Sequence, residues 1–172
     1  MKNRALIRRL ALCAMLAAFA LVTFVIEMQI PSPVPFPGVK LGLANIFTLV
    51  TLRLYGRREA AGVLAVRIVL GALFTGTLTM FFYSLAGGVC CFLVMAAVYK
   101  ALGEKLTWVT SVLGALAHNA GQMLVAFAVL GKSILFYFPI LVISGIITGA
   151  FTGIAAAAVI RAVGKAGAGS GK

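Results

Sequence analysis

The residues with the most chemical potential lie in one stretch of an otherwise apolar sequence, residues 114–124, which reads GALAHNAGQML. At about 3.6 residues per turn, His118, Asn119 and Gln122 fall within an arc of about 100° on one face of a helix. Such groups are costly in hydrocarbon unless they meet partners or line a hydrated cavity. Two interpretations therefore stay open: a ligand-binding face, or a set of hydrogen bonds that joins neighbouring helices.

The composition predicts the surroundings of this polar face. The 172-residue sequence is 63% hydrophobic and 10% charged, whereas soluble domains have about 25% charged residues. A helix that spans a bilayer needs about 20 mainly apolar residues, and nearly the whole stretch 10–160 divides into such pieces. We predict an all-α integral membrane protein, a compact bundle of six transmembrane helices. It forms a single domain over residues 1–162, followed by a disordered tail at 163–172.

The first two predicted spans are separated by a proline-rich loop. The apolar run 10–26 follows a basic start and passes into this loop without a small-residue cleavage site, so we predict a retained helix rather than a signal peptide. The second span, 38–53, is short for a bilayer. Four alternating prolines within 31–37 favour an extended segment, which we predict to fold over the outer end of the bundle as a lid.

Four further spans complete the predicted bundle. The stretch 60–102 is long enough to cross twice, and a break is expected at Gly76, which sits among three threonines. The fifth span is predicted over 108–130 and the sixth over 135–160. The sixth carries a stripe of small residues that favours close helix packing, formed by Gly145, Gly149 and Gly153.

The distribution of basic residues predicts the orientation of these spans. With both termini in the cytoplasm, only Lys40 and Lys132 of the 15 lysines and arginines face outside, Arg67 lies within a span, and all others face the cytoplasm. This excess is the positive-inside pattern of membrane proteins. The sequence therefore predicts a multi-pass protein of the bacterial cytoplasmic membrane with both termini cytoplasmic.

Polar residues of other spans are predicted to reach the level of the polar face. Arg67 lies eight residues beyond Glu59, or roughly 12 Å along a helix. His118 lies at a comparable depth from the charged turn near Glu104, and further polar residues lie nearer the outer side. Together they predict a hydrated pocket between mid-membrane and the outer surface. Its candidate substrate-binding residues are Arg67, His118, Asn119, Gln122, Asn45, Lys40, Glu27, Tyr83 and Ser84.

The charges of this pocket indicate the kind of ligand. Arg67 and Lys40 outweigh Glu27 when His118 is neutral. A guanidinium group offers a planar fork of donors that suits carboxylate or phosphate. We therefore expect a small-molecule substrate that is anionic or strongly polar.

Each candidate also has a structural interpretation. Glu27 and Arg67 would form a buried ion pair, and Lys40 would extend its ammonium group to the membrane surface. Asn45 would cap or cross-link helices, and Tyr83 would anchor the protein at the membrane interface. The sequence leaves these alternatives open.

The composition argues against several other functions. The net charge of +12 comes from residues that punctuate apolar spans, whereas a nucleic-acid binder gathers them on a water-exposed face. The chain has no Asp, so an Asp-rich magnesium site is excluded. Its three cysteines, Cys13, Cys90 and Cys91, lie in apolar spans without CxxC spacing. We predict no metal, no cofactor, no catalytic residue and no nucleic-acid partner.

Four segments in order resemble a known family. They are 37–48, reading PGVKLGLANIFT, 84–88, reading SLAGG, 114–122, reading GALAHNAGQ, and 138–153. They resemble the bacterial Gx transporter family, whose members are also labelled heptaprenyl diphosphate synthase component I. That family is similar to the substrate-binding S components of energy-coupling factor (ECF) transporters, which are compact six-helix membrane proteins.

The resemblance implies both partners and a function. S components bind a transmembrane coupling subunit, which works with ATPase subunits, through an A-x-x-x-A strip on the first helix that Ala14 and Ala18 match. We expect a non-enzymatic subunit of an uptake transporter that captures a polar, anionic metabolite or vitamin-like compound. No Walker motif is present, so partners would supply the energy. The alternative is a non-catalytic membrane accessory subunit of polyprenyl (heptaprenyl) diphosphate synthesis.

Overall fold

The computed structural model describes residues 2–30, 40–103 and 106–169, and these residues form helices and connecting segments without any strand. The prediction of an all-α protein is confirmed. The helices are α1 (Lys2–Glu27), α2 (Asn45–Leu54), α3 (Arg57–Thr75), α4 (Leu78–Leu102), α5 (Thr107–Leu130), the 3-10 helix η1 (Gly131–Tyr137) and α6 (Phe138–Gly169).

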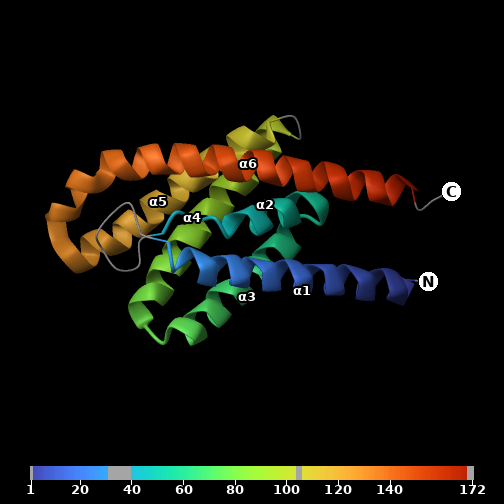
Figure 1. Ribbon diagram of the computed structural model, residues 1–172, viewed down its shortest axis with the longest axis horizontal. Helices are drawn as coiled ribbons and strands as arrows, with labels where there is room; N and C mark the ends of the chain where they lie inside the picture. The colour runs from blue at the N-terminus through green and yellow to red at the C-terminus, as the bar shows by residue number, and fades with distance from the viewer. Residues whose placement is uncertain (1, 31–39, 104–105, 170–172) are drawn as a thin grey trace.

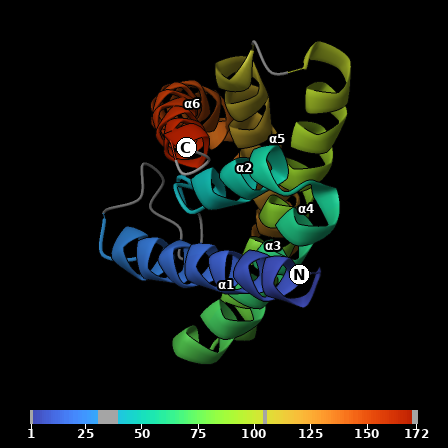
Figure 2. The same ribbon diagram turned by 90° about the vertical axis from the view of Figure 1, so that its right-hand side faces the viewer.

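The short helix α2 lies at the centre of the arrangement. It runs between the long helices α1 and α6 (Figure 1) and contacts every other α-helix of the described chain. The most extensive interfaces join α4 to α5 and α5 to α6. The start of α1 and the end of α6 lie at the same end of the molecule, as Figures 1 and 2 both show.

Three helical stretches are long and apolar enough to cross a membrane: 3–27, 78–102 and 107–163. The third contains α5, η1 and α6. Large apolar side chains project from these helices, and Leu78 and Phe136 are 76% and 86% exposed. Exposed apolar side chains are favourable where the surrounding solvent is lipid. The six-span count and the cytoplasmic position of both termini stay predictions.

Helix boundaries agree with the sequence at one break and differ at two other places. Helix α3 ends at Thr75 and α4 begins at Leu78, so the break at Gly76 is confirmed; Gly76 has a left-handed φ of 65°, which suits a helix C-terminus. The second predicted span, 38–53, is instead a helix of 10 residues, or about 15 Å, too short to cross a bilayer core of about 30 Å.

Helix α6 continues to Gly169, so residues 163–169, predicted as disordered, are helical. The proposed proline lid at 31–37 lies outside the described residues.

Glycine residues let the long helices approach closely. A Cβ atom on Gly121 would lie 2.5 Å from the carbonyl oxygen of Ala86, so α4 and α5 touch through their backbones. On α6, a Cβ on Gly149 or on Gly153 would lie 2.6 Å or 2.8 Å from a Cα atom of α5. The small-residue stripe predicted for the last span therefore packs against α5, as such stripes do in membrane helices.

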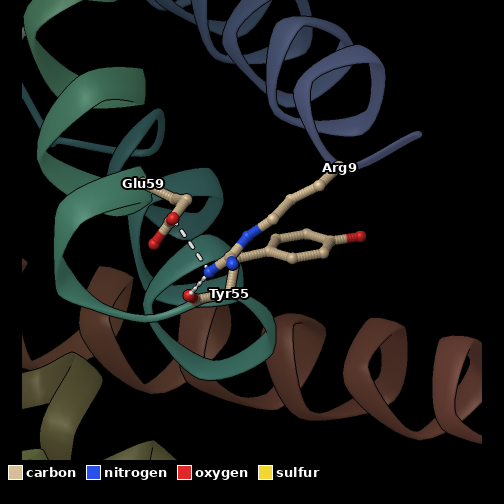
Figure 3. A network of polar contacts seen from close by, with 3 residues as sticks. All are labelled: Arg9, Tyr55 and Glu59. Atoms are coloured by element: carbon tan, nitrogen blue, oxygen red, sulfur yellow. Dashed lines mark hydrogen bonds and ion pairs between the residues drawn. The ribbon is translucent and has the colours of Figure 1, made fainter. Parts of the chain in front are cut away.

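A polar network joins α1 to the turn between α2 and α3 (Figure 3). The Arg9 guanidinium donates to the Tyr55 carbonyl oxygen and forms an ion pair with Glu59, with an Nη2–Oε1 distance of 2.8 Å. The Arg9 and Glu59 side chains are 45% and 25% exposed, and pairs exposed in this way contribute at most about 1 kcal/mol. The network therefore orients α1 more than it stabilises the fold.

The α4–α5 contact provides a test of this packing. Gly121→Ala is expected to lower the free energy of unfolding by about 1–3 kcal/mol, because the added methyl group forces two backbones apart. Gly62→Ala is the matched control, since nothing lies within 4 Å of a Cβ at that helical position. Thermal unfolding of both variants in one detergent measures the difference. Equal midpoints would contradict the close backbone contact.

Candidate functional site

The non-helical segment 40–44 is held by side chains from three helices. The Lys40 N–H donates to Gln122 Oε1 of α5 at 3.1 Å, and the Gly42 N–H donates to the Glu27 carboxylate at the end of α1. The Thr148 hydroxyl of α6 lies 3.5 Å from the Leu41 carbonyl oxygen and donates at 2.8 Å to the Ser144 carbonyl oxygen of its own helix. Backbone groups that no helix satisfies thus find polar partners inside the protein, as buried backbone groups require.

The imidazole ring of His118 lies between this segment and α4. His118 is 2% exposed, and its Nδ1 lies 3.0 Å from Nδ2 of Asn45 at the start of α2. A Cβ atom on Gly42 would lie 2.9 Å from the ring, and one on Gly87 of α4 would lie 2.8 Å from it. The absence of side chains at these two glycines leaves the space that the ring occupies.

Two cationic side chains meet at one aromatic ring. Lys40 Nζ lies 3.5 Å from the centroid of the Phe24 ring, and Arg67 Cζ lies 5.9 Å from the same centroid. Arg67 and Phe24 are both 3% exposed. A Cβ atom on Gly88 would lie 3.2 Å from Arg67 Nη2, so α4 approaches the guanidinium group just as it approaches His118. Cation–π contacts of this kind stabilise a desolvated cation only in part.

Several polar atoms of this region are buried without a hydrogen-bond partner in the described chain. The donors are Nε and Nη2 of Arg67 and Nζ of Lys40. The others are Oδ1 of Asn45 and the hydroxyl of Thr48, which lies one turn further along α2. Native proteins leave few such groups unpaired, so the combination indicates a site that a ligand would complete.

We call the following residues the polar cluster: Glu27, Lys40, Asn45, Thr48, Arg67, His118 and Gln122. Its cations interact electrostatically with Glu27 and with His118. Arg67 and Glu27 do not form a direct ion pair, however: the ion pair between described side chains, with an N–O distance within 4.0 Å, is Arg9–Glu59. With Lys40 and Arg67 charged and Glu27 ionised, the cluster carries one excess positive charge.

The remaining predicted site residues lie beside the cluster or away from it. Asn119 faces α6, where its Nδ2 donates to the Leu141 carbonyl oxygen at 2.7 Å, and its Oδ1 is buried without a partner in the described chain. Tyr83 is 2% exposed and packs in an apolar group with Met123, Ile134 and other residues. Ser84 is buried one turn before Gly88. Ligand contact by these three residues stays a prediction.

Two members of the site were not predicted from the sequence. Phe24 looks like any apolar residue of the first helix, and no sequence signal distinguishes it. Thr48 could have been found, because it lies three residues after Asn45 and therefore on the same face of a helix. The glycine pair Gly87–Gly88 belongs to a segment that carries the family resemblance, and the structure places it against both His118 and Arg67.

Ala14 and Ala18, the predicted partner-interface residues, line a groove between α1 and α3. Both are exposed, and the groove has a volume of about 580 Å³. Its floor is apolar, and Arg58 and Glu59 lie at one end. The structure therefore leaves this strip open to a partner, and whether a partner binds there stays a prediction.

The described residues contain no group of three or more His, Cys, Asp or Glu side chains that could hold a metal ion. The three cysteines are free thiols. The polar cluster itself consists of cationic, carboxylate, amide, imidazole and hydroxyl side chains.

Fold and site define the class of the protein: an all-helical chain with membrane-spanning character and a buried, net positive polar cluster between its helices. The model of the family described as heptaprenyl diphosphate synthase component I matches residues 16–159, and the chain belongs to this family. No match was found among curated proteins or among solved structures.

The contact between Gly42 and His118 can be tested with a matched pair of variants. Gly42 and Gly76 both have left-handed backbone angles, with φ of 79° and 65°. Alanine costs about 1–2 kcal/mol at either position because of this backbone conformation. Only at position 42 does the new methyl group also meet Asn45 and His118, which adds about 1–3 kcal/mol. A lower unfolding midpoint for Gly42→Ala than for Gly76→Ala is expected, and equal midpoints would mean that the ring does not pack against the segment.

Proposed function

We propose that this protein is the binding subunit of a small-molecule uptake transporter in the bacterial cytoplasmic membrane, and that it captures a polar, anionic metabolite or vitamin-like compound in the polar cluster. One observation carries the proposal: the buried guanidinium of Arg67 has unpaired N–H donors, and Lys40 places a second cation, whose Nζ is also buried and unpaired, in the same region. Asn119, Tyr83 and Ser84 are proposed to border the ligand from α5 and α4.

The energetics of burial support an anionic ligand. Removing an ion from water costs several kcal/mol even after the protein relaxes, and a single carboxylate cannot neutralise two cations. An anion placed between Arg67 and Lys40 would supply the missing charge and accept the unpaired N–H groups. Charge-assisted hydrogen bonds of this kind are among the strongest in proteins.

The uncharged members of the cluster support a ligand that also carries hydrogen-bond donors. Asn45 Oδ1 is an unpaired acceptor, and the Thr48 hydroxyl can accept or donate. A simple inorganic anion would leave Asn45 Oδ1 unsatisfied. A metabolite that joins an anionic group to N–H or O–H groups satisfies both sets.

Replacement of Arg67 tests the site. Arg67→Ala is expected to weaken ligand binding by about 100-fold or more, because the anion then faces a buried site without its main partner. Native mass spectrometry of the gently extracted protein measures the loss and identifies the small molecule that the wild type retains. Lys132→Ala is the control, since it removes one positive charge from an exposed position of η1. Unchanged ligand retention in Arg67→Ala would remove this residue from the site.

The same variant separates ligand binding from a structural ion pair. If Arg67 served mainly to neutralise Glu27, Arg67→Ala would unfold the protein and Glu27→Gln would rescue it. In the binding interpretation, Arg67→Ala stays folded in the membrane and loses its ligand. Unfolding midpoints of the single and double variants decide between the two.

A second candidate function is favoured by the family description. Heptaprenyl diphosphate synthase component I is a name that implies another synthase component. Under this candidate the protein is a non-catalytic membrane accessory subunit of polyprenyl diphosphate synthesis. Its basic turns would bind the soluble subunit, and an apolar groove such as the one between α1 and α3 would accommodate a prenyl chain.

Both candidates predict a partner, and the groove between α1 and α3 is proposed as the surface that binds it. Ala18→Trp fills this groove, so copurified subunits are expected to be lost while small-molecule retention in the polar cluster is unchanged. Val22→Trp is the control, because Val22 is exposed on α1 but does not line the groove. Quantitative mass spectrometry of the purified complexes measures the change. Equal partner yields from the two variants would exclude the groove.

The identity of the copurified subunit decides between the two functions. A transmembrane coupling subunit with ATPase subunits supports the transporter. A prenyl synthase, together with a retained polyprenyl chain, supports the biosynthetic role and contradicts the transporter.

A further inference from the structure

A second cavity lies between the end of α2, the start of α5 and the C-terminal half of α6. It has a volume of about 580 Å³. Arg53, near the end of α2, lines it, whereas Asn45 of the polar cluster begins the same helix. Thr48, the cluster residue nearest to Arg53 along α2, is five residues away, or about 7.5 Å along the helix. No residue of the polar cluster lines the cavity. The cavity is therefore a separate site.

The lining of this cavity is amphipathic. Two arginines, Arg53 and Arg161, are among its lining residues. Ile154, Ala157 and Ile160 line it from successive turns of α6. The lining therefore combines positive charge with an apolar surface. A molecule with an anionic head group and a hydrocarbon chain would complement both features.

The two guanidinium groups are held in different ways. Arg53 Cζ lies 5.1 Å from the centroid of the Tyr99 ring, which orients this partly buried side chain. Arg161 is exposed, and its Nε donates to the Ala157 carbonyl oxygen at 3.1 Å. This bond directs the side chain along α6 and leaves its terminal nitrogens for an anion. Arginine binds phosphate through parallel N–H donors of this kind.

A tryptophan marks the position of the cavity relative to the membrane. Trp108, in the first turn of α5, lines the cavity and is 53% exposed. Tryptophan is enriched where lipid head groups meet the hydrocarbon core. Apolar α6 residues such as Ile154, 65% exposed, extend from this level toward the lipid. The cavity thus opens where a phospholipid head group would lie.

We propose that this cavity binds an anionic phospholipid, with its phosphate on Arg53 and Arg161 and an acyl chain along Ile154 and Ala157. The leaflet is the one on the basic side of the protein, where anionic lipids attract clustered lysine and arginine. This site goes beyond the proposed transport function and does not depend on it.

The test uses the full-length protein, delipidated in a neutral detergent and titrated with phosphatidylglycerol. Native mass spectrometry is expected to show one tightly bound lipid in the wild type, and about tenfold weaker binding in Arg161→Gln. Ala157→Trp, which fills the apolar part, is expected to lose the lipid as well. Arg4→Gln is the control, because Arg4 is an exposed arginine of α1 outside the cavity.

Two further titrations distinguish the source of the phosphate group. Phosphatidylcholine is expected to bind more weakly than phosphatidylglycerol, and millimolar inorganic phosphate is expected not to displace the lipid. Displacement by phosphate would show a simple anion site and overturn the proposal. Equal binding of the two lipids, or full binding by both Arg161→Gln and Ala157→Trp, would overturn it too. Neither result changes ligand retention in the polar cluster, so the two proposals fail independently.

Discussion

A guanidinium group that is 3% exposed inside an apolar bundle sets the main constraint on this structure. Arg67 cannot release its proton, so its charge must be balanced by its surroundings. The chain meets part of this demand: Phe24 offers the face of a ring, Glu27 contributes a carboxylate nearby, and Gly88 lets α4 come close without displacing the group. Lys40 adds a second cation to the same place and increases the demand. The anionic ligand that we propose would meet the rest of this demand.

The segment 40–44 explains why so many polar side chains gather here. A helix satisfies its own N–H groups, whereas in this segment the N–H groups of Lys40 and Gly42 donate to the side chains of Gln122 and Glu27. The Leu41 carbonyl oxygen lies 3.5 Å from the Thr148 hydroxyl. Gln122 and Glu27 therefore have a structural task in addition to any contact with a ligand. Irregular backbone between helices is tolerated in membrane proteins where protein surrounds it, and in transporters such interruptions form binding sites. The structural and functional interpretations of the polar residues are thus compatible, because they concern different side chains. Glu27 and Gln122 accept hydrogen bonds from the backbone of the segment, whereas Arg67 and Lys40 keep unpaired donors.

The sequence predicted the helical class and the break at Gly76, because composition and a glycine among threonines are local signals. It did not predict where α2 begins, because no pattern in residues 40–44 distinguishes them from the helix that follows. In the structure Gly42 has a left-handed φ of 79°, and its N–H donates to Glu27. Helical periodicity placed His118, Asn119 and Gln122 on one face. In the structure these three side chains contact different neighbours, because an arc of about 100° on a helix is wide enough to face more than one neighbouring helix. His118 and Gln122 contact the segment 40–44 and α2, whereas Asn119 contacts α6. Such a division depends on which helices pack together, and no pattern in a single helix contains that information.

The chemistry of anion recognition bears on the choice between the two candidate functions. Proteins that hold diphosphates for prenyl transfer use carboxylates to bind magnesium, which then neutralises the phosphates. This chain has no Asp and only three Glu, and of these Glu27 is engaged with the Gly42 N–H and Glu59 with Arg9. An anion in the polar cluster would therefore be neutralised directly by Arg67 and Lys40. Two cations opposed by one carboxylate suit a singly charged anion better than a diphosphate, which carries more charge than the cluster can balance. The charge balance of the site thus favours capture of a small metabolite over a direct role in diphosphate chemistry, and an accessory role in synthesis would have to use other surfaces of the protein.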